Sequence, residues 1–265
     1  IRMDTALDDV AFLANSANRV AVFETLVEAP RPRDELLDRV DASRVTVTRI
    51  LRDLDERDWI TRQGREYTVT PLGEWIHDEF ARLVDEVKAE RRLREPLEWF
   101  PSDLLTFDVR SLRDAEVILL DGSDATLFIR RVLEFHRSGD RIRGVATMVA
   151  PVFVENHWES TVHGDTLLEM VITPRVLDVI LDHPTSARQF REMLAEETTR
   201  FSVAEEIPMS VGIVDGAVGI NLTDEQGVVK GGIVSEDEAV YEWAVDLYET
   251  VREEARPVEP EELTA

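Results

Sequence analysis

Apolar residues recur every three or four positions through the first third of the chain, which is the spacing of amphipathic helices. This pattern predicts helices over residues 7–14, 19–28 and 33–40. A tight turn follows, and Ser43 is placed as the N-cap of a fourth helix over about residues 44–57.

A hairpin and a long helix come next. Two short strands, residues 60–62 and 66–70, flank Gly64, which is a glycine-centred hairpin signal. Pro71 then starts a long helix, since proline is tolerated in a first turn that needs no amide donor. The apolar stripe from Ile76 to Val87 must pack against something. We expect either a dimer seam or a contact with the chain's own C-terminal domain.

From about residue 99 the pattern changes to apolar runs separated by helical stretches. Buried strands are predicted over residues 115–120, 141–150 and 165–173, and helices over residues 124–137, 151–161, 174–182 and 186–199. Asp215 and Gly216 mark a hairpin between two further strands, residues 209–214 and 217–222. A strand over residues 228–234 and a helix over residues 236–254 complete the pattern. Crossover units combined with a hairpin predict a mixed sheet.

The change of pattern predicts two domains and a tail. Residues 1–95 are expected to form one domain that ends in a linker helix, and residues 100–256 an α/β domain with a mixed sheet. Residues 257–265, rich in proline and glutamate, are expected to be a disordered acidic tail. The predicted fold class is therefore α+β, with a long helix joining the two domains.

The charge balance of the chain is strongly acidic. The chain carries 55 acidic and 30 basic residues, a net charge of −25, and Lys88 and Lys230 are its only lysines. An acidic surface in which arginine nearly replaces lysine is typical of proteins from molar-salt cytoplasm, where screening limits self-repulsion. We therefore expect an extremely halophilic archaeon as the source, and an acidic mesophilic protein is the alternative.

A cationic segment interrupts this acidity. Residues 42–52 contain Arg44, Arg49 and Arg52 and no acidic residue. The buried stripe of the helix is expected to comprise Val47, Ile50, Leu51 and Leu54, which leaves the arginines on the outer side. Such a cationic face suits binding to duplex DNA, because guanidinium groups neutralise phosphates.

A short helix, a turn, a second helix with a basic outer face and a hairpin form the winged helix-turn-helix arrangement. The second helix enters the major groove, and the hairpin reaches flanking phosphates or the minor groove. The expected DNA-binding residues are Ser43, Arg44, Val45, Thr48, Arg49, Arg52, Arg62 and Arg65. Two such helices about 34 Å apart read a palindromic operator, which predicts a homodimer. A winged helix that binds protein, with merely solvated arginines, is the alternative.

The motifs also resemble known regulators. Residues 41–60 read DASRVTVTRILRDLDERDWI and residues 67–73 read YTVTPLG. They resemble the recognition helix, wing and post-wing helix of archaeal MarR/ArsR-like transcriptional regulators. Residues 171–180, 207–215 and 239–248 resemble the ligand-sensing domain of the methanogenesis-regulator type found in haloarchaeal regulators. The resemblance implies a dimeric repressor or activator, and it does not identify a ligand.

Two junctions between a strand and a helix are candidate ligand sites. Asp121 and Ser123 lie at the first junction, and Thr173 and Arg175 lie at the second. Free amides at a helix start attract anions, so we expect a small anionic metabolite as ligand. Ordinary helix capping beside a surface arginine is the alternative.

Signals for enzyme chemistry are weak. The chain has no cysteine, which excludes thiolate sites, and its five histidines show no pair at helical i, i+4 spacing. The turn at residues 121–123 lacks the flanking glycines of a nucleophile elbow. We predict a non-enzymatic protein without metal or cofactor; a hydrolase-like or metabolite-processing enzyme with an accessory winged helix is the alternative. Short apolar runs and the absence of a signal-peptide pattern predict a cytoplasmic protein without membrane contact.

Overall fold

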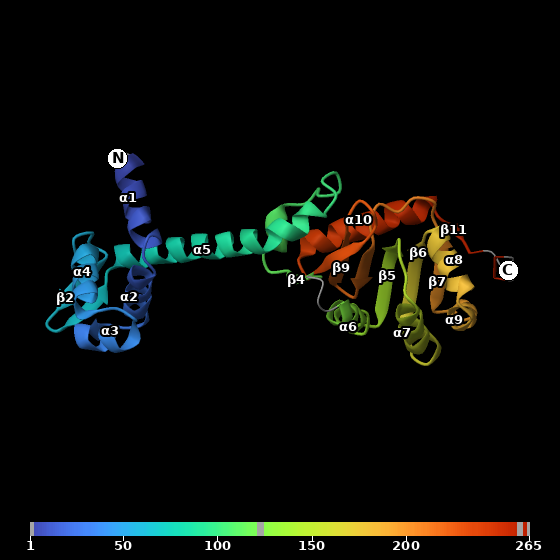
Figure 1. The fold of residues 1–265 in the computed structure, drawn as a ribbon, viewed down its shortest axis with the longest axis horizontal. Helices are drawn as coiled ribbons and strands as arrows, with labels where there is room; N and C mark the ends of the chain where they lie inside the picture. Colours follow the sequence, from blue (N-terminus) through green and yellow to red (C-terminus); the bar gives the residue numbers. More distant parts are fainter. Residues whose placement is uncertain (1–2, 121–124, 259–261, 264–265) are drawn as a thin grey trace. The chain divides into compact units, whose positions relative to one another are not determined.

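The computed structural model describes residues 3–120, 125–258 and 262–263 (Figure 1). The chain divides into two compact units, residues 1–88 and 89–265. The first unit is mainly helical and the second contains a large mixed sheet, which confirms the predicted α+β class. Among the residues that the structure describes, no helix is both long and apolar enough to cross a membrane.

The N-terminal unit combines helices with a small antiparallel sheet of order β1-β3-β2. Its helices are α1 (Met3–Ala14), α2 (Ala17–Glu28), α3 (Arg33–Arg39), α4 (Arg44–Asp55) and the start of α5 (Pro71–Glu98). Its strands are β1 (Arg31–Pro32), β2 (Ile60–Gln63) and β3 (Glu66–Val69). Gly64 turns the β2–β3 hairpin at a φ of 64°, a left-handed conformation that glycine adopts without steric cost.

One apolar core holds these helices together. Phe23 of α2 stacks on Trp59 with ring centroids 5.9 Å apart, and both side chains are buried. The start of α5 packs directly on this core, because a Cβ at Gly73 would lie 2.0 Å from the Trp59 carbonyl oxygen. Only glycine permits this approach of helix to backbone, which explains the glycine at this point of the sequence.

The C-terminal unit is built on an eight-stranded sheet of order β11-β7-β6-β5-β8-β9-β10-β4. Strands β5, β6 and β7 are parallel, and the other pairings are antiparallel. The strands are β4 (Glu116–Leu119), β5 (Arg141–Ala146), β6 (Leu167–Ile172), β7 (Thr199–Val203), β8 (Val211–Val214), β9 (Ala217–Thr223), β10 (Val229–Ser235) and β11 (Arg256–Pro257). The helices are η1 (Val109–Leu112), α6 (Ala125–His136), α7 (Pro151–Val162), α8 (Pro174–Asp182), α9 (Pro184–Leu194) and α10 (Glu238–Glu254).

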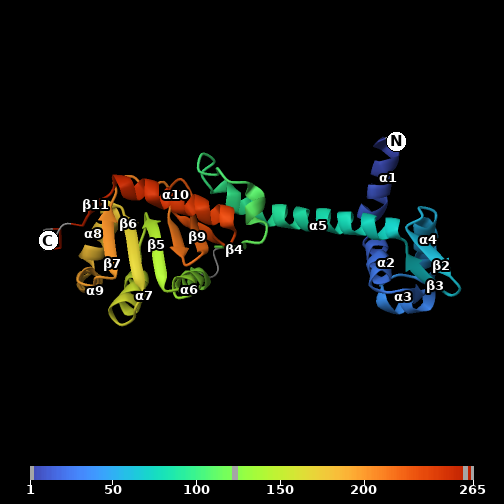
Figure 2. The same cartoon turned by 180° about the vertical axis from the view of Figure 1, so that it is seen from behind.

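Helices cover both faces of this sheet (Figures 1 and 2). On one face α10 buries Val240 and Trp243 against strand residues such as Ile220. On the other face lie α6, α7, α8 and α9, where Phe190 and Leu168 belong to a second buried cluster. The unit is therefore a three-layer sandwich with two separate cores.

Glycines let α6 approach the sheet closely. Gly212, Gly219 and Gly232 lie on β8, β9 and β10 and face the rings of this helix. A Cβ at Gly219 would lie 2.8 Å from the ring of Phe135, closer than side chains tolerate. The glycines thus set the height at which α6 lies above the strands.

The structure differs from the periodicity at several places, and the strand predicted over residues 141–150 ends at Ala146. The helix predicted over residues 186–199 ends at Leu194, because β7 begins at Thr199 and pairs with β6. The tail, predicted to be disordered from residue 257, begins with Pro257 paired to Ser202 of β7. The tail covers the edge of β7, whose backbone groups need partners. Residues 259–261 and 264–265 lie outside the described residues.

Candidate DNA interface and interior cavity

The cationic face of α4 is exposed. Ser43 caps the helix, since its Oγ accepts a hydrogen bond from the Thr46 amide at 3.2 Å. The predicted stripe of Val47, Ile50, Leu51 and Leu54 is buried. The opposite face therefore presents Val45, Thr48, Arg49 and Arg52 to solvent, and the Val45 side chain is 80% exposed.

The three arginines of α4 differ in whether a carboxylate pairs with the guanidinium group. Arg44 lies 3.3 Å from an Asp34 oxygen, and Arg52 lies 2.9 Å from Asp53. Hydrogen bonding to Asp53 and its charge raise the pKa of Arg52. Arg49 has no ion pair or hydrogen bond from its side chain within the described ranges. A ligand phosphate or base must compete with carboxylates at the other two arginines, but not at Arg49.

The hairpin arginines also differ. Arg62 folds back on the hairpin, where its Nε donates to the Gly64 carbonyl at 3.0 Å and its guanidinium lies 5.7 Å from the Tyr67 ring centroid. Arg65 is exposed beside the turn, and its side chain has no internal partner in the part of the chain described. Arg65 is thus the hairpin cation that is ready to reach a second surface.

The structure describes only one of the two junctions predicted to bind an anion. Thr173 caps α8, with its Oγ1 accepting from the Val176 amide at 3.3 Å. Arg175 is exposed in the first turn of α8 and does not line the cavity described below. Asp121 and Ser123 lie outside the described residues. The geometry at the second junction is therefore that of an ordinary capped helix.

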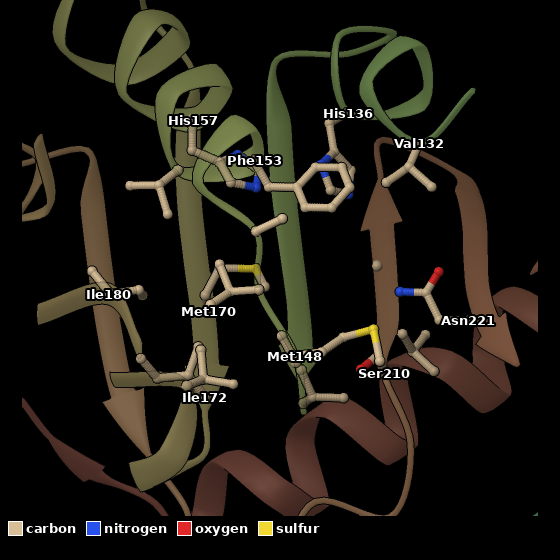
Figure 3. A pocket seen from close by; sticks show the side chains of 18 of the residues that line it. Val132, His136, Met148, Phe153, His157, Met170, Ile172, Ile180, Ser210 and Asn221 are labelled. Carbon is tan, nitrogen blue, oxygen red and sulfur yellow. The ribbon is translucent and has the colours of Figure 1, made fainter. Parts of the chain in front are cut away.

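The C-terminal unit instead contains an apolar cavity of about 320 Å³ (Figure 3). It lies between the sheet and helices α6 and α7. Its walls include Val132, Met148, Phe153, Met170 and Ile172. No acidic residue, lysine or arginine is among the described residues that line it. Both the size and the apolar lining are typical of small-molecule sites.

Two histidines bring polar groups to this cavity. The rings of His136 on α6 and His157 on α7 stack with centroids 4.8 Å apart and an angle of 29° between their planes. The Nδ1 atom of each ring is buried and has no hydrogen-bond partner in the described structure. Leaving a buried polar group unpaired costs roughly 1–3 kcal/mol, so such a pair calls for an explanation.

Both imidazoles are neutral at pH 7. Burial lowers the pKa of His136 to about 4. Burial, followed by the proximity of His136, lowers the pKa of His157 well below its usual range. Within the described residues there is no group of three metal-binding side chains, so the pair lacks the further protein ligands of a typical zinc site.

The sequence does not indicate this pair, because the two histidines are 21 residues apart and show no helical i, i+4 spacing. His136 and His157 belong to different helices, and only the tertiary fold brings them together. A usable signal was present in each helix. Each histidine follows an apolar residue by four positions, Val132 and Phe153 respectively, and so continues an inward-facing stripe.

Two family models match the chain. Residues 7–92 match the HVO_A0261 N-terminal domain, and residues 126–254 match the middle domain of the methanogenesis regulatory protein FilR1. No curated protein sequence matches the chain.

Solved structures are similar only at low scores. The archaeal chromatin protein TrmBL2 is 14% identical with a TM-score of 0.44, covering 91% of this chain and 94% of that chain. A phospholipase D family member, Nuc from Salmonella typhimurium, is 15% identical with a TM-score of 0.41, covering 55% of this chain and 97% of that chain. HmgR of Pseudomonas aeruginosa is 12% identical with a TM-score of 0.24, covering 88% and 94%. The family models thus relate residues 7–92 to the HVO_A0261 N-terminal domain and residues 126–254 to the middle domain of the regulator FilR1, and neither match is specific to the MarR or ArsR type.

Proposed function

We propose that this protein is a sequence-specific DNA-binding transcriptional regulator. The N-terminal unit acts as a winged helix-turn-helix, and the C-terminal unit binds a small molecule that controls it. The observation that carries the proposal is the exposed face of α4, where Arg49 has no internal partner within the described ranges although the chain has a net charge of −25. The match of residues 126–254 to a domain of a regulatory protein supports the same function.

In this function α4 lies in the major groove. Arg49 can donate two hydrogen bonds to the edge of a guanine, and the methyl groups of Val45 can contact a thymine methyl. The Thr48 hydroxyl donates to the Arg44 carbonyl at 2.8 Å, so it is left to accept from a base or a water. Arg65 and Arg62 contact the backbone beside the groove, and Arg62 must first leave the Gly64 carbonyl.

A halophilic archaeal origin agrees with the acidic, lysine-poor composition. At molar salt, counterion release contributes little to affinity. Base contacts and bridging waters must then carry more of the binding free energy. Arginine contacts to bases therefore count for more here than contacts to phosphates.

A homodimer would place two α4 helices on one face of the duplex. The two halves of the stripe from Ile76 to Val87 differ in burial. Ile76 and Phe80 pack against the core of their own N-terminal unit, whereas Leu83 and Val87 are 53% and 47% exposed. We therefore assign the dimer seam to the second half of the stripe, where Leu83 and Val87 are exposed.

A ligand in the C-terminal unit would act by binding one dimer arrangement more tightly than another. A difference of a few kcal/mol between two arrangements is enough to change promoter occupancy. The alternative function is that of a hydrolase-like enzyme. The structure adds no support for it, because the turn at residues 121–123 on which it rests lies outside the described residues.

Fluorescence anisotropy in molar KCl tests the proposal, with labelled DNA from the region upstream of the gene that encodes this protein. Arg49→Ala should weaken specific binding by about 5- to 150-fold, equivalent to roughly 1–3 kcal/mol. Arg130→Ala is the control, since Arg130 is an exposed arginine of the C-terminal unit. Unchanged binding of Arg49→Ala, or binding no tighter than to unrelated DNA, would contradict the proposed regulator.

A further inference from the structure

We propose that the cavity between the sheet and helices α6 and α7 binds an uncharged, largely apolar small molecule that carries at least one hydrogen-bonding group. This inference deepens the sensor role within the proposed function. It replaces the anionic metabolite that the sequence predicts with a ligand of different chemistry.

The size and walls of the cavity set the body of the ligand. A volume of about 320 Å³ lies at the lower end of small-molecule sites. Met148 and Met170 line the cavity, and Phe153 reaches into it from α7 (Figure 3). Methionine side chains are flexible and adapt to irregular apolar shapes, so the walls suit aliphatic or aromatic groups.

The described part of the lining offers no partner for a permanent charge on the ligand. None of the described residues that surround the cavity carries a charged side chain at neutral pH. A carboxylate or phosphate moved there would lose its hydration without gaining a cation. Arg175, the cation that the sequence predicts as a ligand contact, does not belong to the lining.

The histidine pair supplies one polar end. Each neutral imidazole has one N–H donor and one acceptor nitrogen, and the Nδ1 atoms of both rings are shielded and unpartnered in the described structure. Nε2 is therefore the nitrogen left for a ligand. For His136 it lies 3.7 Å from where a Cβ on Gly212 would be, and Gly212 lines the cavity.

A second polar end comes from the sheet. Asn221 of β9 and Ser210 lie away from the histidines and among apolar side chains (Figure 3). The Ser210 hydroxyl is already engaged with Thr147, at 2.9 Å from both its amide nitrogen and its hydroxyl oxygen. The backbone amide of Asn221 donates to the Ser210 carbonyl, but its side-chain amide has no hydrogen-bond partner among the described residues, so the side-chain amide is the group on this side that can still bind a ligand.

Two dyes that share a skeleton and differ by one sulfonate group provide the test on the full chain. N-phenyl-1-naphthylamine is uncharged, and 1-anilinonaphthalene-8-sulfonate is the same skeleton with a sulfonate. We expect saturable binding of the neutral dye by fluorescence and at least about tenfold weaker binding of the sulfonate. Decan-1-ol should displace the neutral dye, and decanoate should not. Equal or tighter binding of the sulfonate or decanoate would overturn the proposal.

Variants locate the bound dye. Ala146 lines the cavity, so Ala146→Leu should weaken neutral-dye binding by about tenfold, whereas Ala217→Leu, on a strand but outside the lining, should not. Val149→Phe fills the same space and replaces Ala146→Leu if that variant does not fold. His157→Phe should weaken displacement by decan-1-ol several-fold while the dye still binds. Dye binding that survives both filling variants would overturn the assigned site.

These measurements are made without DNA, so their failure is distinct from failure of the regulator proposal. Loss of dye binding with intact promoter binding would refute only the cavity ligand. Saturable dye binding in a chain that does not bind its promoter would refute only the DNA-binding function.

Discussion

The imidazole of His136 stacks on that of His157 at a centroid distance of 4.8 Å, and neither ring has a partner for its Nδ1 among the described residues. Because burial keeps both imidazoles neutral, protonating them disfavours the folded state, and the free energy of unfolding depends on pH. The pair therefore links the apolar cavity to a measurable property of the folded chain.

Acid should destabilise the C-terminal unit through His136. Its pKa in the folded state is about 4, below the usual value of 6.5, so the unfolded state binds the proton more tightly. Stability is then lost as the pH falls from about 6.5 towards 4, by up to about 3 kcal/mol. Urea unfolding at several pH values should show a shallower loss for His136→Phe than for the wild type. Parallel curves for the two proteins would show that His136 does not titrate as described.

Gly219 is expected to be intolerant of a side chain. A Cβ there would lie 2.8 Å from the ring of Phe135, so Gly219→Ala must push α6 away from the sheet. We expect a loss of about 1–3 kcal/mol in the free energy of unfolding. Gly216→Ala is the matched control, because no atom lies within 4 Å of the added carbon. If both variants unfold at the same urea concentration, the close packing of α6 is not real.

Removing the carboxylate beside Arg52 should strengthen DNA binding. Asp53 pairs with Arg52 at 2.9 Å, and it competes with a phosphate for the same guanidinium. Asp53→Asn removes this competing carboxylate from the Arg52 guanidinium, so we expect a several-fold gain in affinity by anisotropy in molar KCl. Asp165→Asn, an exposed carboxylate of the C-terminal unit, should have no effect. Weaker binding by Asp53→Asn would mean that Arg52 needs its partner for positioning.

The second half of the α5 stripe should control oligomeric state. Leu83 is 53% exposed, and a charge introduced there would be buried in the proposed seam. Leu83→Glu should convert a dimer into a monomer, as measured by light scattering after gel filtration. Val179→Glu changes a 45% exposed side chain of α8 and should leave the dimer intact. A wild-type chain that is already monomeric would remove the basis for the seam.

The sequence predicts the N-terminal unit well because its elements depend on local signals. The spacing of Val47, Ile50 and Leu54, with Ser43 as N-cap, defines α4 and the direction of its cationic face. Helical periodicity and capping act over a few residues, so they can be read without knowing the fold. Whether Arg44 and Arg52 are engaged by Asp34 and Asp53 was not readable, because side-chain pairing depends on the packed surface.

The C-terminal unit shows what local signals miss. Strand β7 was not predicted, because the periodicity extends the preceding helix through its first residue, Thr199, and pairing with β6 is long-range. The cavity has the same origin. Its lining comes from several strands and helices, so its volume depends on how they pack. The ligand sites predicted at the Asp121 and Thr173 junctions rest on local sequence pattern alone. In the structure Thr173 caps α8.

The order of polar and apolar residues is enough to predict most of the helices, the two hairpins and the side of α4 that faces solvent, since each follows from the period of its own segment. The contact between His136 and His157, and the close approach of α6 to the sheet at Gly212, Gly219 and Gly232, arise from long-range packing. Contacts between residues far apart in sequence depend on the packing of all layers together. No single segment contains that information.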